Sequence, residues 1–397
     1  MRFNPALLRT DIPPIPEARR WVEGLTFPDD RPLIDVSQAA PSEPPPRALR
    51  DHIAELTRDT PEAHLYGPVL GLPALRQEVA SEWQQSYTGT VTADQVAITP
   101  GCNQAFVAAL AAIAGPGDEV ILPTPWYFNH KMALDMASVE TVPLTSGPDL
   151  VPDPVNARAL ITSKTRAIVL VTPNNPTGVE YPPETIAAFR DLAREHGIAL
   201  ILDETYRDFH ASEGAPHDLF RDPDWHDTVI DLYSFSKTYR LMGHRVGAII
   251  ASEKVLAQVE KVQDTQVICA NQLGQRAALW GMQNLRNWRA GERKEILTRR
   301  TQLAESFASL SGWDVRGLGA YFAFVTHPFD AASADVARLM VREAGVLALP
   351  ATMFAPASDL TRERALRIAF ANIDSSGIRE MAERLDQLGG RAGLALV

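Results

Sequence analysis

Lys237 has the surroundings of a reactive amine. It lies in the polar segment 234–238, directly after the apolar run 229–233, and Arg245 follows shortly downstream. An α/β sheet binds its ligands at the carboxyl ends of its strands, where this lysine is expected to emerge. A buried amine beside cations loses its proton readily and can form a Schiff base. The segment alone is also typical of a surface lysine in a polar turn, but the downstream arginine favours the reactive amine.

An acid, a tyrosine and an asparagine follow two other apolar runs. Asp203 closes the run 198–202, and an acid that ends a buried strand needs a partner. It is either a carboxylate held against a cationic ring nitrogen or the cap of a following helix. Tyr206 is close enough along the chain to serve the same site, or it packs in the core. Asn175, in the turn 174–178, can donate its side-chain amide to a ligand oxygen, although the turn alone needs no ligand.

Three further segments supply a backbone cup, an aromatic ring and a cation. Gly101 lets the backbone approach a ligand closely, and the N–H groups of Cys102 and Asn103 begin a predicted helix, which suits a phosphate. Tyr127 can stack on a planar ring or pack in the core. Arg367 interrupts an apolar run, so it binds an anion, best a carboxylate, or forms a buried ion pair. Together with the lysine and the acid, this set predicts pyridoxal 5′-phosphate as cofactor and an amino acid as substrate.

The elements that position these residues alternate between strands and helices. Continuous apolar runs, typical of strands buried on both faces of a parallel sheet, occur at 167–172 and 198–202, and further strands are expected at 95–100, 118–123, 229–233 and 246–251. Helical spacing lies between several of them, and the alternation predicts a doubly wound α/β domain. After residue 252, a long helical stretch and two strand-like segments predict a smaller α+β unit. The proline-rich first 45 residues are expected to form an extended arm, followed by a turn into a helix.

Composition excludes several classes of protein. The chain has 397 residues, more than one hydrophobic core usually holds, and 45% of them are apolar. A formal charge of −11 argues against a nucleic-acid partner and a polybasic membrane anchor. No window has the length of a membrane span, and the N-terminus does not resemble a secretory signal. Two cysteines, Cys102 and Cys269, cannot alone build a disulfide framework or a zinc cluster, so we expect a metal-free protein of the reduced cytoplasm.

The motifs around these residues resemble those of the class I/II aminotransferases, fold-type-I enzymes that use pyridoxal phosphate. The similar segments are 234–239 with 243–247, 175–178, 203–206, 66–76 and 367–370. The resemblance extends from about residue 33 to the C-terminus. It implies a large doubly wound, mostly parallel sheet domain and a smaller α+β domain built from N- and C-terminal segments. The boundaries we expect are 1–45 for the arm and part of the small domain, 46–290 for the large cofactor-binding domain and 291–397 for the C-terminal small domain.

The resemblance also implies a role for each site residue. Lys237 holds the cofactor as an internal aldimine and moves the proton at the substrate Cα. Arg367, with Asn175, grips the substrate α-carboxylate, and Ala39 stands near it where the family often has a glycine. Tyr66 reaches the phosphate in the neighbouring subunit, which implies a homodimer with shared active sites. The other residues contact the cofactor: Ser234, Arg245 and the backbone of Gly101, Cys102 and Asn103 at the phosphate, Tyr127 on the ring face, Asp203 at the ring nitrogen, and Tyr206 and Asn175 at the phenolic oxygen.

The implied reaction moves an amino group from an amino acid to a 2-oxo acid in two half-reactions. A carbon–sulfur β-lyase or a related Cα-deprotonating enzyme is the alternative, because the same residues would serve it. A regulatory sensor with this fold would carry an added DNA-binding domain, whereas only about 30 residues precede the similar region.

The substrate itself stays open at this stage. Alanines at 39 and 351 replace glycines that the family often has near the substrate. The aromatic residues expected at the entrance, which favour an apolar or aromatic substrate side chain, are Trp126, Tyr321 and Phe354. A dicarboxylic substrate would need a further arginine, and the sequence does not place Arg286, Arg289 or Arg293.

Overall fold

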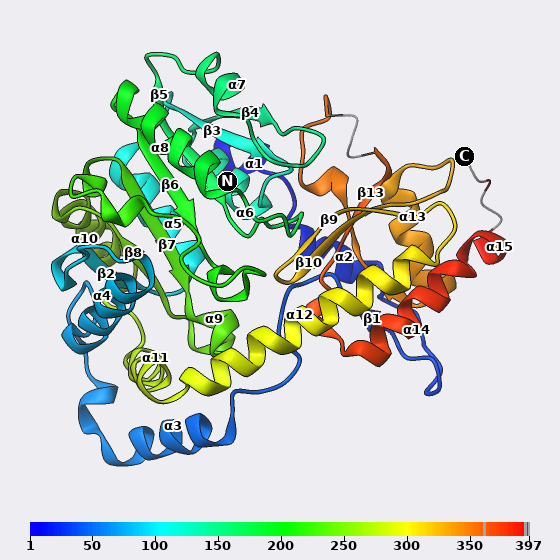
Figure 1. Cartoon of the computed structure of the whole chain (residues 1–397), viewed down its shortest axis with the longest axis horizontal. Coiled ribbons are helices and arrows are strands. Elements are labelled where there is room, and N and C mark those ends of the chain that lie inside the picture. The colour runs from blue at the N-terminus through cyan, green and yellow to red at the C-terminus, as the bar shows by residue number, and fades with distance from the viewer. Residues whose placement is uncertain (360–362, 393–394, 396–397) are drawn as a thin grey trace.

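Most strands belong to one large sheet. The computed structural model describes residues 1–359, 363–392 and 395, and within them seven strands make up this sheet (Figure 1). They are Val96–Thr99 (β2), Glu119–Thr124 (β3), Glu140–Thr145 (β4), Thr165–Val171 (β5), Ala199–Asp203 (β6), Val229–Ser234 (β7) and Gly247–Ile250 (β8). Their spatial order is β2-β8-β7-β6-β5-β3-β4, and all run parallel except β8. The predicted mostly parallel sheet is confirmed.

The large sheet is buried on both faces. In β5, Ile168 and Leu170 belong to the core on one face, and Ala167 and Val169 to the core on the other. Helices α5 (Cys102–Ile113), α6 (Phe128–Met136) and α10 (Glu253–Val267) cover the second face. The first face is covered by α4 (Pro73–Tyr87), α8 (Pro183–His196) and α11 (Gln272–Asn284), with α3 (Arg47–Asp59) packed on α11 and α7 (Pro154–Arg158) on α8. Two-sided burial explains the continuous apolar runs of these strands.

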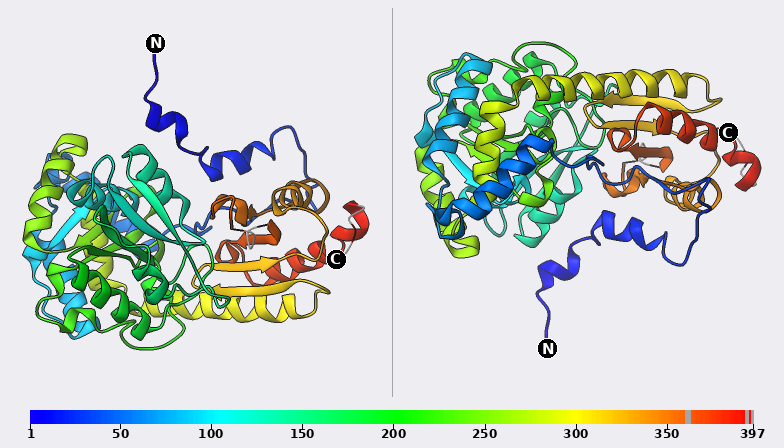
Figure 2. Two further views of the ribbon diagram at one scale, coloured as in Figure 1. Left: turned by 90° about the horizontal axis from the view of Figure 1, so that it is seen from above. Right: turned by 90° about the horizontal axis from the view of Figure 1, so that it is seen from below.

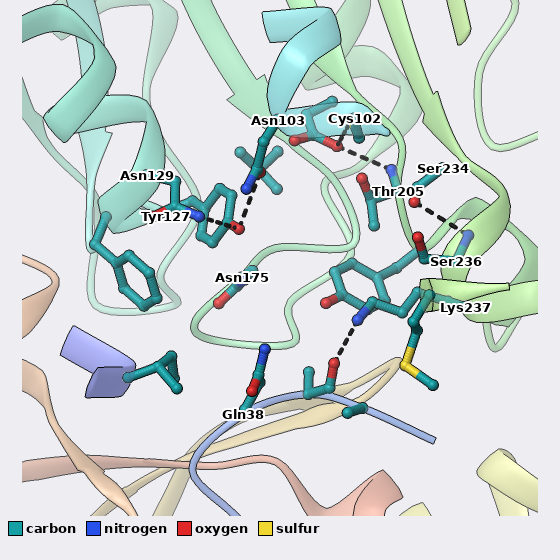
Figure 3. A pocket seen from close by; sticks show the side chains of 18 of the residues that line it. Gln38, Cys102, Asn103, Tyr127, Asn129, Asn175, Thr205, Ser234, Ser236 and Lys237 are labelled. Carbon is teal, nitrogen blue, oxygen red and sulfur yellow. Dashed lines mark hydrogen bonds between the residues drawn. The ribbon is translucent and has the colours of Figure 1, made fainter. Parts of the chain in front are cut away.

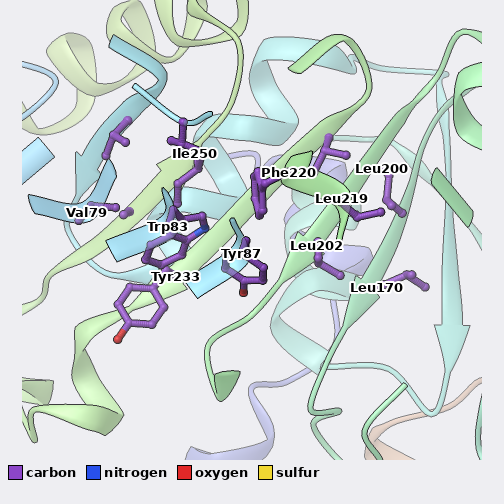
Figure 4. Packing of buried hydrophobic residues seen from close by; sticks show 14 of the residues in the cluster. Val79, Trp83, Tyr87, Leu170, Leu200, Leu202, Leu219, Phe220, Tyr233 and Ile250 are labelled. Carbon is purple, nitrogen blue, oxygen red and sulfur yellow. The ribbon is translucent and has the colours of Figure 1, made fainter. Parts of the chain in front are cut away.

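Large aromatic side chains pack α4 against the sheet (Figure 4). Trp83 is fully buried, and its ring centroid lies 5.1 Å from that of Tyr233 in β7 and 6.1 Å from that of Tyr87. Buried aromatic pairs of this geometry contribute packing energy beyond their apolar area. The packing therefore fixes β6 and β7, whose last residues are Asp203 and Ser234.

A smaller unit is built from the N-terminal and the C-terminal parts of the chain. Its antiparallel sheet has the order β12-β13-β10-β9, with the bounds Leu349–Pro350 (β12), Ala365–Ile368 (β13), Phe322–Thr326 (β10) and Asp314–Gly319 (β9). Beside it, β1 (Ile34–Asp35) pairs in parallel with β11 (Val346–Leu347). The helices that contribute to its core are α12 (Arg286–Ala308), α13 (Ser333–Leu339), α14 (Ser375–Asp386) and α15 (Leu388–Ala392).

The two units lie side by side, and α12 runs along both (Figure 2). The expected boundary at 290 falls inside α12, and the boundaries at 45 and 290 stay predictions. In the part of the chain that the structure describes, no helix combines the length and the apolar character that crossing a bilayer requires.

The N-terminal segment differs from the expected extended arm. It holds two short helices, α1 (Pro5–Arg9) and α2 (Pro14–Arg20), each with proline in its first turn. Proline favours the start of a helix because its missing N–H is unpaired there in any case. Some of the prolines that suggested an extended chain therefore stand at helix starts, as Pro14 does in α2 and Pro46 does before α3, whereas Pro41, Pro44 and Pro45 lie outside helices.

Candidate active site

The carboxyl ends of β5, β6 and β7 open into a cavity of about 300 Å³. Figure 3 shows Asn103, Tyr127, Asn175 and Lys237 directed towards one space. Most of the predicted site residues line this cavity: Ala39, Cys102, Asn103, Tyr127, Asn175, Asp203, Tyr206, Ser234, Lys237, Arg245 and Arg367. The fold thus brings together residues that are separated by more than 300 positions in the chain.

Lys237 projects from a short helix that follows β7. The Ser234 hydroxyl caps this helix, α9 (Phe235–Thr238), by accepting the backbone N–H of Ser236 at 3.3 Å. The Lys237 amine donates to the carbonyl oxygen of Ala39. Burial, together with the charges of Arg245 and Arg367, lowers the pKa of Lys237 to about 8. The environment therefore makes this amine lose its proton more readily than an ordinary lysine does.

Asp203 is held as a carboxylate at the end of β6. Burial alone would raise its pKa, but a hydrogen bond from His130 and the charge of His130 lower it, and Thr205 adds hydrogen bonds, so the net pKa lies below the usual value. His130 Nε2 lies 3.2 Å from Asp203 Oδ2, and the backbone N–H of Thr205 donates to Oδ1 at 3.0 Å. Cys102 Sγ lies 3.8 Å from Oδ1. Since burial raises the pKa of the Cys102 thiol well above its usual value, this thiol stays neutral.

A backbone cup lies where β2 passes into α5. Gly101 has φ +89°, and a Cβ there would lie 2.4 Å from Arg245 Nη2. A Cβ at Gly247 would lie 2.7 Å from the backbone nitrogen of Cys102. The α5 N-terminus has no side-chain cap, and its first residues, Cys102 and Asn103, line the cavity together with Arg245 and Ser234. Free helix N–H groups beside a guanidinium and a hydroxyl fit a phosphate group.

Arg245 has a left-handed backbone, with φ +53°. Its Nη1 donates to the carbonyl oxygen of Met242 at 3.0 Å, and no carboxylate of the described residues lies within ion-pair distance of it. A strained backbone that is held in place by its surroundings is typical of ligand-binding positions.

Two tyrosines flank the space between the cup and the smaller unit. Asn129 Nδ2 donates to the Tyr127 hydroxyl at 2.8 Å, and that hydroxyl donates to Asn103 Oδ1 at 3.2 Å. Burial raises the pKa of Tyr127 to about 12 and that of Tyr206 well above its usual value. Both phenols therefore stay protonated and can donate hydrogen bonds at neutral pH.

Arg367 is buried in β13 without an ion pair. Nη1 donates to Asn175 Oδ1 at 2.9 Å and Nη2 donates to the Ser37 carbonyl oxygen, while Nε is buried with no hydrogen-bond partner among the described residues. Its guanidinium carbon lies 4.8 Å from the ring centroid of Phe354 and 5.0 Å from that of Phe322. Burial lowers the pKa of Arg367 to about 10. A buried cation in an aromatic surrounding, with no carboxylate beside it, is suited to an anionic ligand.

Several residues singled out in the sequence lie elsewhere. Tyr66 is 81% exposed and does not line the cavity of its own chain. The aromatic residues expected at the entrance are buried, and none of them lines the cavity: Trp126, Tyr321 and Phe354. Three arginines of α12 line a separate groove beside Glu82: Arg286, Arg289 and Arg293. The expectation that these aromatic residues form the entrance is therefore wrong for this chain.

Sequence reasoning missed several residues of the site. His130 follows Tyr127 in the chain and lies against Asp203, and Thr205 follows Asp203 by two positions. His130 gave no signal in the sequence, because its helix is of mixed polarity and a histidine is not unusual there. The cavity lining that likewise gave no signal consists of Ile15, Gln38, Ala40, Phe128, Asn129, Val171, Ser236 and Met242.

One protein family matches almost the whole chain. The family model of aminotransferases of class I and II matches residues 31–385. The chain belongs to the class I and II aminotransferases. Members of this family use pyridoxal phosphate, so the predicted fold type, cofactor and enzyme class are confirmed.

Individual relatives agree with the family. The aminotransferase is 29% identical to an aromatic aminotransferase of Arabidopsis thaliana over 389 residues, 95% of this chain and 94% of that protein. It is 29% identical to an aspartate/prephenate aminotransferase of Thermus thermophilus over 333 residues, 82% of this chain and 84% of that protein. The solved structure of Escherichia coli YbdL, described with a methionine aminotransferase function, is similar in fold, with a TM-score of 0.88 and 24% identity over 98% of this chain and 100% of that chain. These comparisons give no support to the lyase alternative.

Proposed function

We propose that this cavity carries out both half-reactions of an aminotransferase, with Lys237 as the proton carrier and Arg367 as the carboxylate anchor. The observation that carries the proposal is the unpaired, buried Arg367 on the same cavity as an amine whose pKa is lowered to about 8. Amino acids and 2-oxo acids share the α-carboxylate, so one arginine can orient both substrates. Asn175, which accepts a hydrogen bond from Arg367, orients the guanidinium from the other side.

The remaining residues fit the cofactor by their chemistry. Pyridoxal phosphate, when bound, withdraws electrons from the substrate and thereby makes the Cα proton acidic. Lys237 Nζ accepts this proton. The Asp203 carboxylate would keep the ring nitrogen protonated, and Tyr127 would pack on the ring. The groups assigned to the cofactor oxygens are Tyr206 and Asn175 at the phenolic oxygen, and Ser234, Arg245 and the backbone of Gly101, Cys102 and Asn103 at the phosphate.

We also propose a homodimer with shared sites in the cytoplasm. The exposure of Tyr66, at 81%, supports a contact beyond its own chain, and two free cysteines support a reducing compartment. Light scattering should report a dimer. Mixing inactive Tyr66→Ala and Lys237→Ala proteins should restore part of the activity, because one site of the mixed dimer then has both native residues. No recovery after subunit exchange would contradict shared sites.

The assignment of Lys237 is tested by trapping the cofactor. The holoprotein is reduced with borohydride and digested, and the peptides are identified by mass. We expect the cofactor mass on the peptide that contains Lys237, and none in Lys237→Ala. Lys131→Ala is the matched control, because Lys131 lies in α6 beside His130 but pairs with Asp135 at 2.6 Å. A label on any other lysine would overturn the assignment.

A further inference from the structure

We propose that the amino donor carries an uncharged side chain, and that this enzyme discriminates against aspartate and glutamate. The inference rests on the function proposed above and deepens it. The charged residues in the described cavity lining are Asp203, Lys237, Arg245 and Arg367, and each of them already has an assigned partner. The lining therefore offers no further cation to a second substrate carboxylate.

The region left for the substrate side chain has apolar walls and two amides. Ile15 reaches the cavity from α2, and Phe128 begins α6. The Phe128 ring centroid lies 5.9 Å from the Arg367 guanidinium carbon and 5.5 Å from that of Phe354. An α-carboxylate on Arg367 therefore places the substrate beside Phe128. Asn129 and Gln38 are the polar groups of this region, and in Figure 3 Asn175 lies between Asn129 and Lys237.

The two amides are already engaged with neutral or remote partners. Asn129 Nδ2 donates to the Tyr127 hydroxyl at 2.8 Å. Gln38 Oε1 accepts a hydrogen bond from Arg19 Nη2 at 2.8 Å, and Arg19 is an exposed residue of α2 outside the cavity lining. Neither group can neutralise a carboxylate, which needs a cation or several donors when it leaves water. Apolar side chains meet no such penalty, and an amide side chain meets a much smaller one than a carboxylate does.

Further sources of a cation among the described residues would be the arginines of α12 and the segments around Tyr66. Arg286, Arg289 and Arg293 line a separate groove. If the partner subunit presents its Tyr66 segment to the site, as proposed, the stretch 65–75 contains no Lys or Arg, and Arg76, which follows it, donates from Nε to the Val96 carbonyl oxygen at 2.7 Å. The stretch 266–275 lies against the Tyr66 segment, since the Gly67 N–H donates to Cys269 Sγ at 3.4 Å. It contains no Lys or Arg either, and Arg276, which follows it, has a buried Nε.

Donor preference is measured with the holoenzyme in the amino-donor half-reaction, without oxo acid. The donors are alanine, methionine, glutamine, aspartate and glutamate, and alanine serves as reference because its methyl group does not reach Asn129 or Gln38. We expect kcat/KM for methionine and glutamine to exceed that for the two dicarboxylic donors by on the order of 100-fold. Comparable or higher values for aspartate or glutamate would overturn the inference. Failure of all five donors would overturn the proposed function and this inference with it.

Substitutions of Asn129 and Arg19 test which side chains determine the donor preference. Asn129→Lys should raise kcat/KM for glutamate, relative to kcat/KM for alanine, by on the order of 10-fold, because it adds the missing cation. Asn129→Met should leave this ratio unchanged. Arg19→Met tests the one exposed arginine that reaches Gln38. If Arg19 swings inward to bind a second carboxylate, Arg19→Met would remove activity with glutamate and spare methionine, and that result would contradict the proposal. We expect the ratio of kcat/KM for glutamate to kcat/KM for methionine to be the same in Arg19→Met and in the native enzyme.

Discussion

Replacement of Arg367 by lysine keeps a positive charge and removes the fork of parallel donors. In the structure Nη1 and Nη2 already hold Asn175 and the Ser37 carbonyl, and the guanidinium still has an unpartnered Nε. A lysine ammonium is a point charge that cannot grip two carboxylate oxygens in one plane. The variant therefore loses at least one charge-assisted hydrogen bond to the substrate, about 1.5 to 3 kcal/mol, or about 10- to 150-fold in kcat/KM.

The assay is single-turnover kinetics of each half-reaction. The same loss is expected for the amino acid and for the 2-oxo acid, because both present their α-carboxylate to Arg367, and cofactor affinity should change little. Arg316→Lys is the matched control, since Arg316 is an exposed arginine of the same sheet that donates to the Pro148 carbonyl at 3.2 Å. A change below about threefold in Arg367→Lys, or a loss in only one half-reaction, would refute the assignment.

Further predictions concern the amine and the phosphate cup. Lys237→Ala should lose the visible absorption of bound cofactor and all measurable turnover; residual turnover above background would contradict the role of Lys237. Capture of cofactor by the apoprotein requires a neutral Lys237, whose pKa is lowered from 10.5 to about 8. The capture rate should therefore rise with pH, reach half of its maximum near pH 8 and a plateau above about pH 9, and at pH 7 be about one tenth of that plateau. A rate still rising at pH 10 would contradict the lowered pKa. Gly101→Ala should weaken cofactor binding by on the order of 10- to 100-fold, since its Cβ would lie 2.4 Å from Arg245 Nη2 at a φ of +89°. Gly115→Ala, where nothing lies within 4 Å, should bind cofactor normally, and equal affinities of the two variants would argue against the cup.

The central strands were predictable because each is buried on both faces. A strand such as β5 then shows a continuous apolar run, and the polar residue that ends it marks the site. Two of the edge strands lack this signature, whereas the edge strand β2 is buried and was predicted. Most of β4 (Glu140–Thr145) is exposed or half-buried, and β9 (Asp314–Gly319) mixes charged, apolar and glycine residues without a continuous apolar run, so neither was predicted.

The residues of the candidate site also fall into two groups, those that the sequence indicates and those that it does not. Lys237, Asp203 and Arg367 stand out because each is a charged residue next to an apolar run, where burial of a charge requires a reason. Ile15, Gln38 and Asn129 do not stand out, since they reach the cavity only through the packing of α2, the residues after β1 and α6. For the aromatic residues the error was of the other kind, because residues that were expected to line the cavity do not line it. Phe354 was expected at the entrance, but it is fully buried against Phe128, because sequence position does not say which side of a loop faces the cavity.

The most direct test of the whole account is the visible spectrum of the holoprotein while single amino acids are added without oxo acid. The account predicts that a neutral donor shifts the absorption of the bound cofactor to that of its amino form, with one equivalent of the matching 2-oxo acid released per site and no ammonia. Release of ammonia with the spectrum restored after each turnover would contradict it, and would instead indicate an elimination reaction.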